Sequence, residues 1–102
     1  MAYTKYRIDR VGGRKKRIEA GAYIKSLRLA RDPKIKQRAL ADKLKLFYYT
    51  FISQVETGTT RVPPENLSDW AKVLGAEPKE FAKKLLSFYD RHTFRAIFGT
   101  KG

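Results

Sequence analysis

The sequence contains no cysteine and only one histidine. These two absences argue against disulfides, metal sites and several kinds of catalytic site. Without cysteine there can be no disulfides, so cysteine usage does not indicate whether the protein resides in an oxidising or a reducing compartment. A lone His92 cannot assemble a zinc site, so we expect a surface histidine, no metal and no other cofactor. No histidine stands at motif spacing from Ser53, and Gly12-Gly13 matches neither a phosphate-binding loop nor a dinucleotide fingerprint. We therefore expect no enzymatic activity.

Long apolar runs and acidic residues are also scarce. No run approaches the roughly 18 apolar residues that a membrane span needs, and the N-terminus lacks a signal-peptide core. Only 10 acidic residues stand against 23 basic ones, which gives a net charge of +13. Residues 1–51 carry 15 basic and 4 acidic side chains (+11), whereas residues 52–102 carry 8 and 6 (+2). We expect a protein of the cytoplasm or nucleoid with no membrane partner.

What is present is enough for one folded domain. The 102 residues are 42% hydrophobic and include six Phe, six Tyr and one Trp, too apolar for a disordered polycation. Solubility alone needs a net charge of only about 2–8, so the basic half predicts a polyanionic partner, with nucleic acid as the first candidate.

Charge and apolar spacing divide the chain into three parts. Residues 1–17 form a basic N-terminal arm in which Gly12-Gly13 disfavours regular structure. Residues 18–89 form the helical domain, and residues 90–102 are a short apolar C-terminal segment. The seven cations of the arm are Lys5, Arg7, Arg10, Arg14, Lys15, Lys16 and Arg17.

Apolar residues at helical spacing predict five helices in residues 18–89. The first starts near Ile18 and ends before Asp32-Pro33. The second and third span about residues 37–45 and 49–57, and Gly58 ends the third. The fourth opens at Pro63-Pro64 and places Trp70 in the core, and the fifth covers residues 78–89.

One stretch carries a recognisable motif. Gln37, Leu40-Ala41, Ile52-Ser53, Glu56 to Gly58 and Pro63 follow one another in an order that resembles the phage-repressor and Cro-like helix-turn-helix family, also called the xenobiotic-response-element (XRE) family. The resemblance covers about residues 21–86. It implies an all-α, five-helix lambda-repressor-like domain in which the third helix enters the DNA major groove. Residues that match the family's first helix are Gly21, Ile24, Leu27 and Arg28.

The resemblance also implies a function: a sequence-specific transcriptional regulator that binds double-stranded DNA, with repression of a nearby promoter as the expected mode. A homodimer on a pseudo-palindromic operator is expected, since one helix-turn-helix reads few base pairs. Base readers are expected at Tyr49, Thr50, Ser53 and Gln54. Backbone contacts are expected from Gln37, Arg38, Tyr48, Thr57, Thr59, Thr60 and Arg61. The family further implies an ion pair between Arg28 and Glu56 that ties the third helix to the first.

The turn between the two helices departs from the family pattern. Lys45 stands where a glycine with positive φ is usual, and the segment from Lys45 to Tyr48 is one residue longer. The register of Tyr48, Tyr49 and Thr50 is therefore open by one position. Tyr48 and Tyr49 each have a second interpretation, as packing residues.

Two other functions fit the sequence. An antitoxin-like protein-interaction module would use the apolar C-terminal segment to hold a partner, and a structured-RNA-binding protein would rely on the arm. The same segment supplies the candidate dimer interface, unless it folds back on its own core. The apolar residues available for such an interface are Phe88, Phe94, Ile97 and Phe98.

Overall fold

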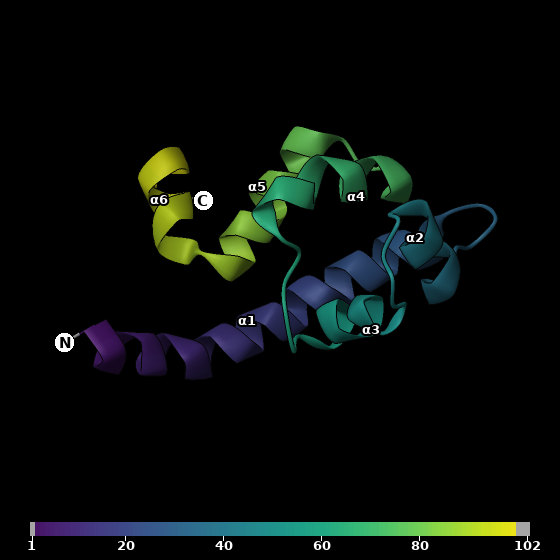
Figure 1. Ribbon diagram of the computed structural model, residues 1–102. Coiled ribbons are helices and arrows are strands. Elements are labelled where there is room, and N and C mark those ends of the chain that lie inside the picture. The colour runs from purple at the N-terminus through teal and green to yellow at the C-terminus, as the bar shows by residue number, and fades with distance from the viewer. Residues whose placement is uncertain (1, 100–102) are drawn as a thin grey trace.

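The computed structural model describes residues 2–99, and it describes side chains from residue 13 onward. The chain is all-helical as predicted, with six α-helices, one 3₁₀ turn and no strand in that range (Figure 1). The five-helix prediction is one helix short, because part of the C-terminal segment is also helical. The elements are α1 (Ala2–Ala30), α2 (Gln37–Lys43), α3 (Thr50–Thr57), η1 (Pro64–Asn66), α4 (Leu67–Leu74), α5 (Pro78–Tyr89) and α6 (Arg91–Phe98).

Helix α1 is much longer than the sequence predicted. It runs unbroken from Ala2 through Gly12-Gly13 to Ala30, so the prediction of an irregular arm is wrong for residues 2–17. A glycine costs about 1 kcal/mol in a helix relative to alanine, but the arginines and lysines around this pair are good helix formers. The first turns of α1 extend beyond the other helices (Figure 1). The side chains of Lys5, Arg7 and Arg10 lie outside the described residues.

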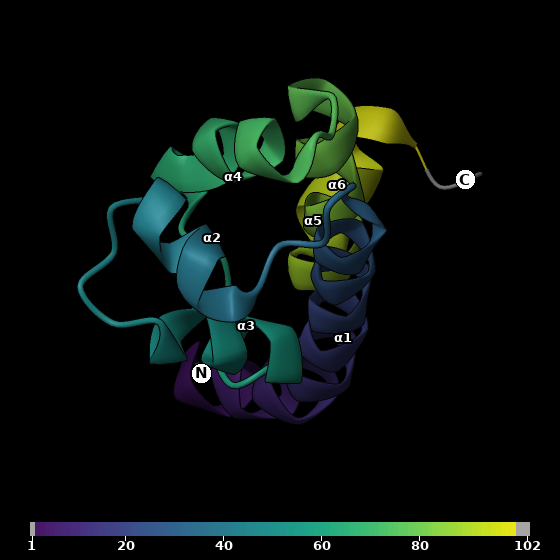
Figure 2. The same cartoon turned by 90° about the vertical axis from the view of Figure 1, so that its right-hand side faces the viewer.

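The core lies where α1, α3, α4 and α5 meet. Helix α1 packs against both α3 and α5, and α5 packs against α4 (Figure 2). Trp70 is 1% exposed, as the sequence predicted for a core residue. The buried apolar residues are Ala20, Ile24, Leu40, Ala41, Ile52, Val55, Val62, Trp70, Ala71, Leu74, Phe81 and Leu85.

Helices α1 and α3 touch through their backbones at Gly21. A Cβ atom at Gly21 would overlap the main-chain carbonyl of Glu56. Just beyond the end of α3, Gly58 takes a left-handed φ of 85° and packs against Ile18. Glycine at these two positions lets α3 lie directly against α1.

In the turn after α2, a lysine occupies a backbone position with positive φ, where glycine is the usual residue. Lys45 adopts φ 59°, a left-handed conformation that glycine takes far more easily than other residues. The N–H of Lys45 donates to the Asp42 carbonyl at 3.1 Å and the N–H of Leu46 to that of Ala41 at 2.9 Å. These two bonds form a Schellman motif, which offsets a conformational cost of about 1–2 kcal/mol for a non-glycine residue.

The remaining helices begin and end at capping residues. Pro63-Pro64 opens a 3₁₀ turn that leads into α4, and Pro78 begins α5 after the Glu77 cap. The carboxylate of Asp90 caps α6, accepting from the N–H of Thr93 at 3.1 Å and from its hydroxyl at 2.6 Å. The same two bonds lower the pKa of Asp90.

Helix α6 was not predicted because it is short, with eight residues, and its N-terminal signal is a single aspartate cap. Within residues 2–99, no helix has the length and hydrophobicity needed to cross a membrane.

Candidate nucleic-acid interface

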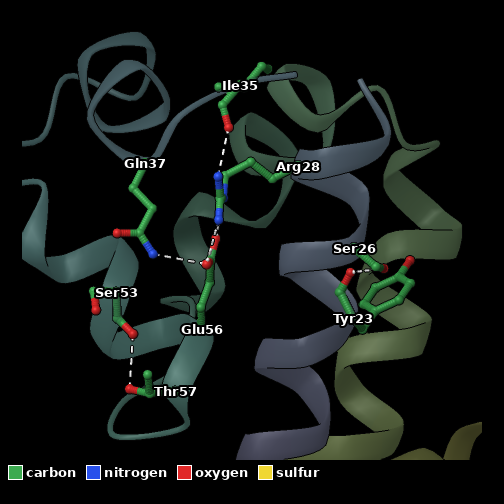
Figure 3. Close-up of polar contacts among 8 residues, drawn as sticks. All are labelled: Tyr23, Ser26, Arg28, Ile35, Gln37, Ser53, Glu56 and Thr57. Carbon is green, nitrogen blue, oxygen red and sulfur yellow. Dashed lines mark hydrogen bonds and ion pairs between the residues drawn. The ribbon is translucent and has the colours of Figure 1, made fainter. Parts of the chain in front are cut away.

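A buried polar network joins three helices behind the outer face of α3 (Figure 3). The Arg28 guanidinium of α1 binds the Glu56 carboxylate of α3 through two bonds, Nε to Oε2 at 2.6 Å and Nη2 to Oε1 at 3.0 Å. Both residues are buried, with 6% and 7% of their surface exposed. The ion pair that the sequence predicted is therefore present.

Two further bonds complete the network. Arg28 Nη1 donates to the Ile35 carbonyl at 2.8 Å, and Gln37 Nε2 donates to Glu56 Oε1 at 3.0 Å. Gln37, predicted as a phosphate contact, is thus also a structural residue at the first turn of α2. Its amide nitrogen carries two hydrogens, and the second remains able to meet a phosphate. The network fixes the start of α2 and the end of α3 on the same arginine.

The outer face of α3 is polar and open. Ile52 and Val55 are fully buried, which turns the opposite side of the helix outward. Of the four predicted base readers, Thr50 and Gln54 are exposed, Tyr49 is 44% exposed and Ser53 is half-buried. The structure therefore brings all four to one side of a firmly anchored helix. Thr57 is exposed at the far end, with its hydroxyl bound to the Ser53 carbonyl at 2.9 Å.

Some of the predicted phosphate contacts are exposed to solvent, whereas others are partly buried or packed against other side chains. Arg38 is exposed on α2, and its guanidinium lies 4.9 Å from the centre of the Tyr49 ring. Thr59 is exposed and Thr60 half-buried. Arg61 stacks on Tyr89 of α5 at 4.4 Å, so this cation is partly committed to the fold.

The described cations of the arm divide in the same way. Arg14 and Lys15 are exposed on α1. Lys16 lies 3.4 Å from the Glu19 carboxylate, and Arg17 donates through Nε to the Gly58 carbonyl at 2.9 Å. Arg17 therefore stabilises the end of α3, a role that the sequence did not predict.

The loop between α2 and α3 exposes two aromatic rings. Phe47 is 98% exposed and Tyr48 75% exposed, so the packing interpretation of Tyr48 is wrong. Sequence reasoning did not single out Phe47. The available signal was the extra turn residue, because an inserted residue at the end of a Schellman motif has no place in the core.

The C-terminal residues split between core and surface. Phe88 is half-buried, with its ring centre 6.4 Å from that of Tyr23, and Phe94 is half-buried against Phe98 at 5.0 Å. Ile97 is 62% exposed and Phe98 47%. Ile97 and Phe98, but not Phe88 or Phe94, line an apolar groove of about 470 Å³ between α5 and α6.

Burial shifts the pKa values of two tyrosines of the helical domain. Burial raises the pKa of Tyr89, whose hydroxyl oxygen accepts from the Val62 N–H at 3.3 Å. Burial also raises the pKa of Tyr23. His92 is exposed, as expected. Across the part of the chain that the structure describes, no three acidic or histidine side chains gather as metal ligands would.

No family profile, curated protein or solved structure matches this chain.

Proposed function

We propose that the chain is a sequence-specific regulator of transcription that binds double-stranded DNA, with a lambda-repressor-like arrangement of helices α1 to α5. The observation that carries the proposal is the polar, exposed face of α3, held from behind by the Arg28–Glu56–Gln37 network. A recognition helix needs a buried apolar face that packs on the domain and an exposed polar face that can meet the bases, and α3 has both. The +11 charge of residues 1–51, which include α1, α2 and the first two residues of α3, attracts the protein to DNA. Repression of a nearby promoter is the mode we propose.

In this proposal α3 enters the major groove by its N-terminal end. Gln54 grips an adenine through both amide atoms, and Thr50 places its methyl group against a thymine. Gln37, Arg38 and Thr59 hold the phosphates on either side. The exposed cations of α1, such as Arg14 and Lys15, supply affinity without sequence preference.

Replacing Gln54 with alanine tests the reading role. The variant should bind the preferred site more weakly by about 1–3 kcal/mol and should lose the preference for one base pair in each half-site. Because the Gln54 side chain is exposed, the melting temperature of the variant should match that of the wild type. Fluorescence anisotropy with a labelled duplex measures the affinity.

Lys15→Ala is the matched control for a phosphate contact, because Lys15 is exposed on α1, away from the proposed base readers. It should weaken binding to preferred and scrambled duplexes by the same factor, since phosphates are alike in every sequence. The reading role of α3 is refuted if Gln54→Ala and Ser53→Ala both retain the full wild-type preference for the selected site.

We also propose that the chain acts as a homodimer, because a two-fold pair places two α3 helices about 34 Å apart on one face of the duplex. The exposed Ile97 and Phe98 on α6 are the contacts that remain for this interface, since Phe88 and Phe94 are partly used by the fold.

Sedimentation tests the dimer. At micromolar concentration the protein should run at twice the 11.8 kDa chain mass, and Ile97→Asp should return it to the monomer. A monomer both with and without DNA contradicts the proposed dimer. It would leave the α5–α6 groove as a surface for another protein, the main role in an antitoxin-like module.

A further inference from the structure

Phe47 and Tyr48 form an aromatic pair on the surface without support from the core. Their ring centres lie 6.5 Å apart, and their exposed fractions are 98% and 75%. The loop that carries them, residues 44–49, bulges from the edge of the molecule opposite α1 (Figure 2). Almost all of the Phe47 ring meets solvent, so a partner that covered it would gain the free energy of burying that apolar surface.

The charges around the pair select the partner. Lys43 and Lys45 are exposed just before Phe47, and Arg38 lies over the ring of Tyr49 just after the pair. Asp42 is the single acidic residue between positions 37 and 55, a stretch that holds three basic ones. The partner must therefore be anionic at its rim and apolar at its centre.

The DNA major groove has this pattern. Its walls are phosphates, and the C5 methyl of thymine is the apolar group that the base edges present. Only Tyr49 separates the pair from Thr50, the first residue of α3, so a helix that enters the groove by its N-terminus carries Phe47 to the edge of the groove. Tyr48 has a hydroxyl that can donate to a phosphate, whereas Phe47 has no polar group and can make only apolar contacts.

We propose that Phe47, supported by Tyr48, reads a thymine methyl group next to the bases that α3 reads. This inference rests on the proposed function, because it requires α3 to lie in the major groove. It adds a reader from the turn to the four predicted at the start of α3 and along it, and it assigns a purpose to the longer turn.

Deoxyuridine substitution isolates the methyl group. Each thymine of the selected duplex is replaced in turn by deoxyuridine, which removes the methyl and keeps the base pair. At one thymine per half-site, wild-type affinity should fall about fourfold, the factor that burial of one methyl-sized group provides. Phe47→Ala should bind the thymine duplex more weakly and should show no difference between thymine and deoxyuridine at that position.

Leu29→Ala removes an exposed apolar side chain of α1 that has no part in the proposed interface. It is the control and should retain the wild-type response to deoxyuridine. Phe47→Ala should melt at the wild-type temperature, because its ring leaves no cavity.

Three results would overturn the inference. If the wild type prefers the selected duplex but deoxyuridine costs it and Phe47→Ala the same everywhere, Phe47 reads no methyl although the proposed function stands. If the wild type prefers no duplex at all, the proposed function fails and the inference fails with it. Tighter binding to phosphatidylserine vesicles than to duplex, lost in Phe47→Ala, would make the pair a lipid-binding surface.

Discussion

Replacing Glu56 with glutamine, or Arg28 with methionine, should lower the free energy of unfolding by about 3 kcal/mol in each case. Either change leaves a buried charge without its partner. Glutamine at position 56 leaves the guanidinium of Arg28 without a neutralising carboxylate. Methionine at position 28 leaves the Glu56 carboxylate with only the neutral amide of Gln37. At roughly 4–8 °C per kcal/mol for a domain near this size, the melting temperature should fall by more than about 10 °C.

The Lys16–Glu19 pair is the matched control, because it joins the same charge types at 3.4 Å on the surface of α1. Glu19→Gln should change the free energy of unfolding by about 0–1 kcal/mol. Urea unfolding of the three variants measures the difference. Equal melting temperatures for the wild type, Arg28→Met and Glu56→Gln would show that the network does not hold α3 to α1.

Gly21→Ala should destabilise the protein by about 3 kcal/mol, at the upper end of the usual cost of overpacking. The added Cβ meets the main-chain carbonyl of Glu56, and backbone cannot swing aside as a side chain can. Helix α3 must move off α1 to make room, which also disturbs the bond geometry at Arg28. The variant should therefore lose affinity for DNA together with stability.

Gly13→Ala on the same helix is the control. A Cβ there meets only the flexible Arg17 side chain, at 3.3 Å, and alanine favours helix over glycine by about 1 kcal/mol. This variant should be as stable as the wild type or more so. If Gly21→Ala is also neutral in thermal unfolding, the close approach of α1 and α3 at Glu56 is wrong.

Much of the fold was predictable because it depends on local spacing. The apolar residues of α3, α4 and α5 repeat at three and four residues, so these helices and the buried position of Trp70 were predictable. The Arg28–Glu56 pair was predictable only from the resemblance. The two residues are 28 positions apart, and no rule of local spacing pairs residues at that separation.

The features that the sequence did not reveal depend either on helix propensity summed over many residues or on how the chain folds in three dimensions. Whether α1 continues through Gly12-Gly13 depends on the total helix propensity of the surrounding residues, not on the glycines alone. The exposed position of Phe47 comes after a left-handed turn at Lys45. A lysine does not predict such a turn, because lysine seldom adopts a positive φ. The double role of Gln37 and the role of Arg17 required the position of α3 relative to α1.

Selection from random duplex DNA, followed by competition, tests the central claim most directly. The selected duplex should be bound about 10³-fold or more tightly than a scrambled duplex at physiological salt, and structured RNA should compete no better than the scrambled DNA. The logarithm of the binding constant should fall linearly with the logarithm of salt concentration, by about 0.9 for each phosphate contact. Equal affinity for selected and scrambled duplexes, or stronger competition by RNA, would contradict the account.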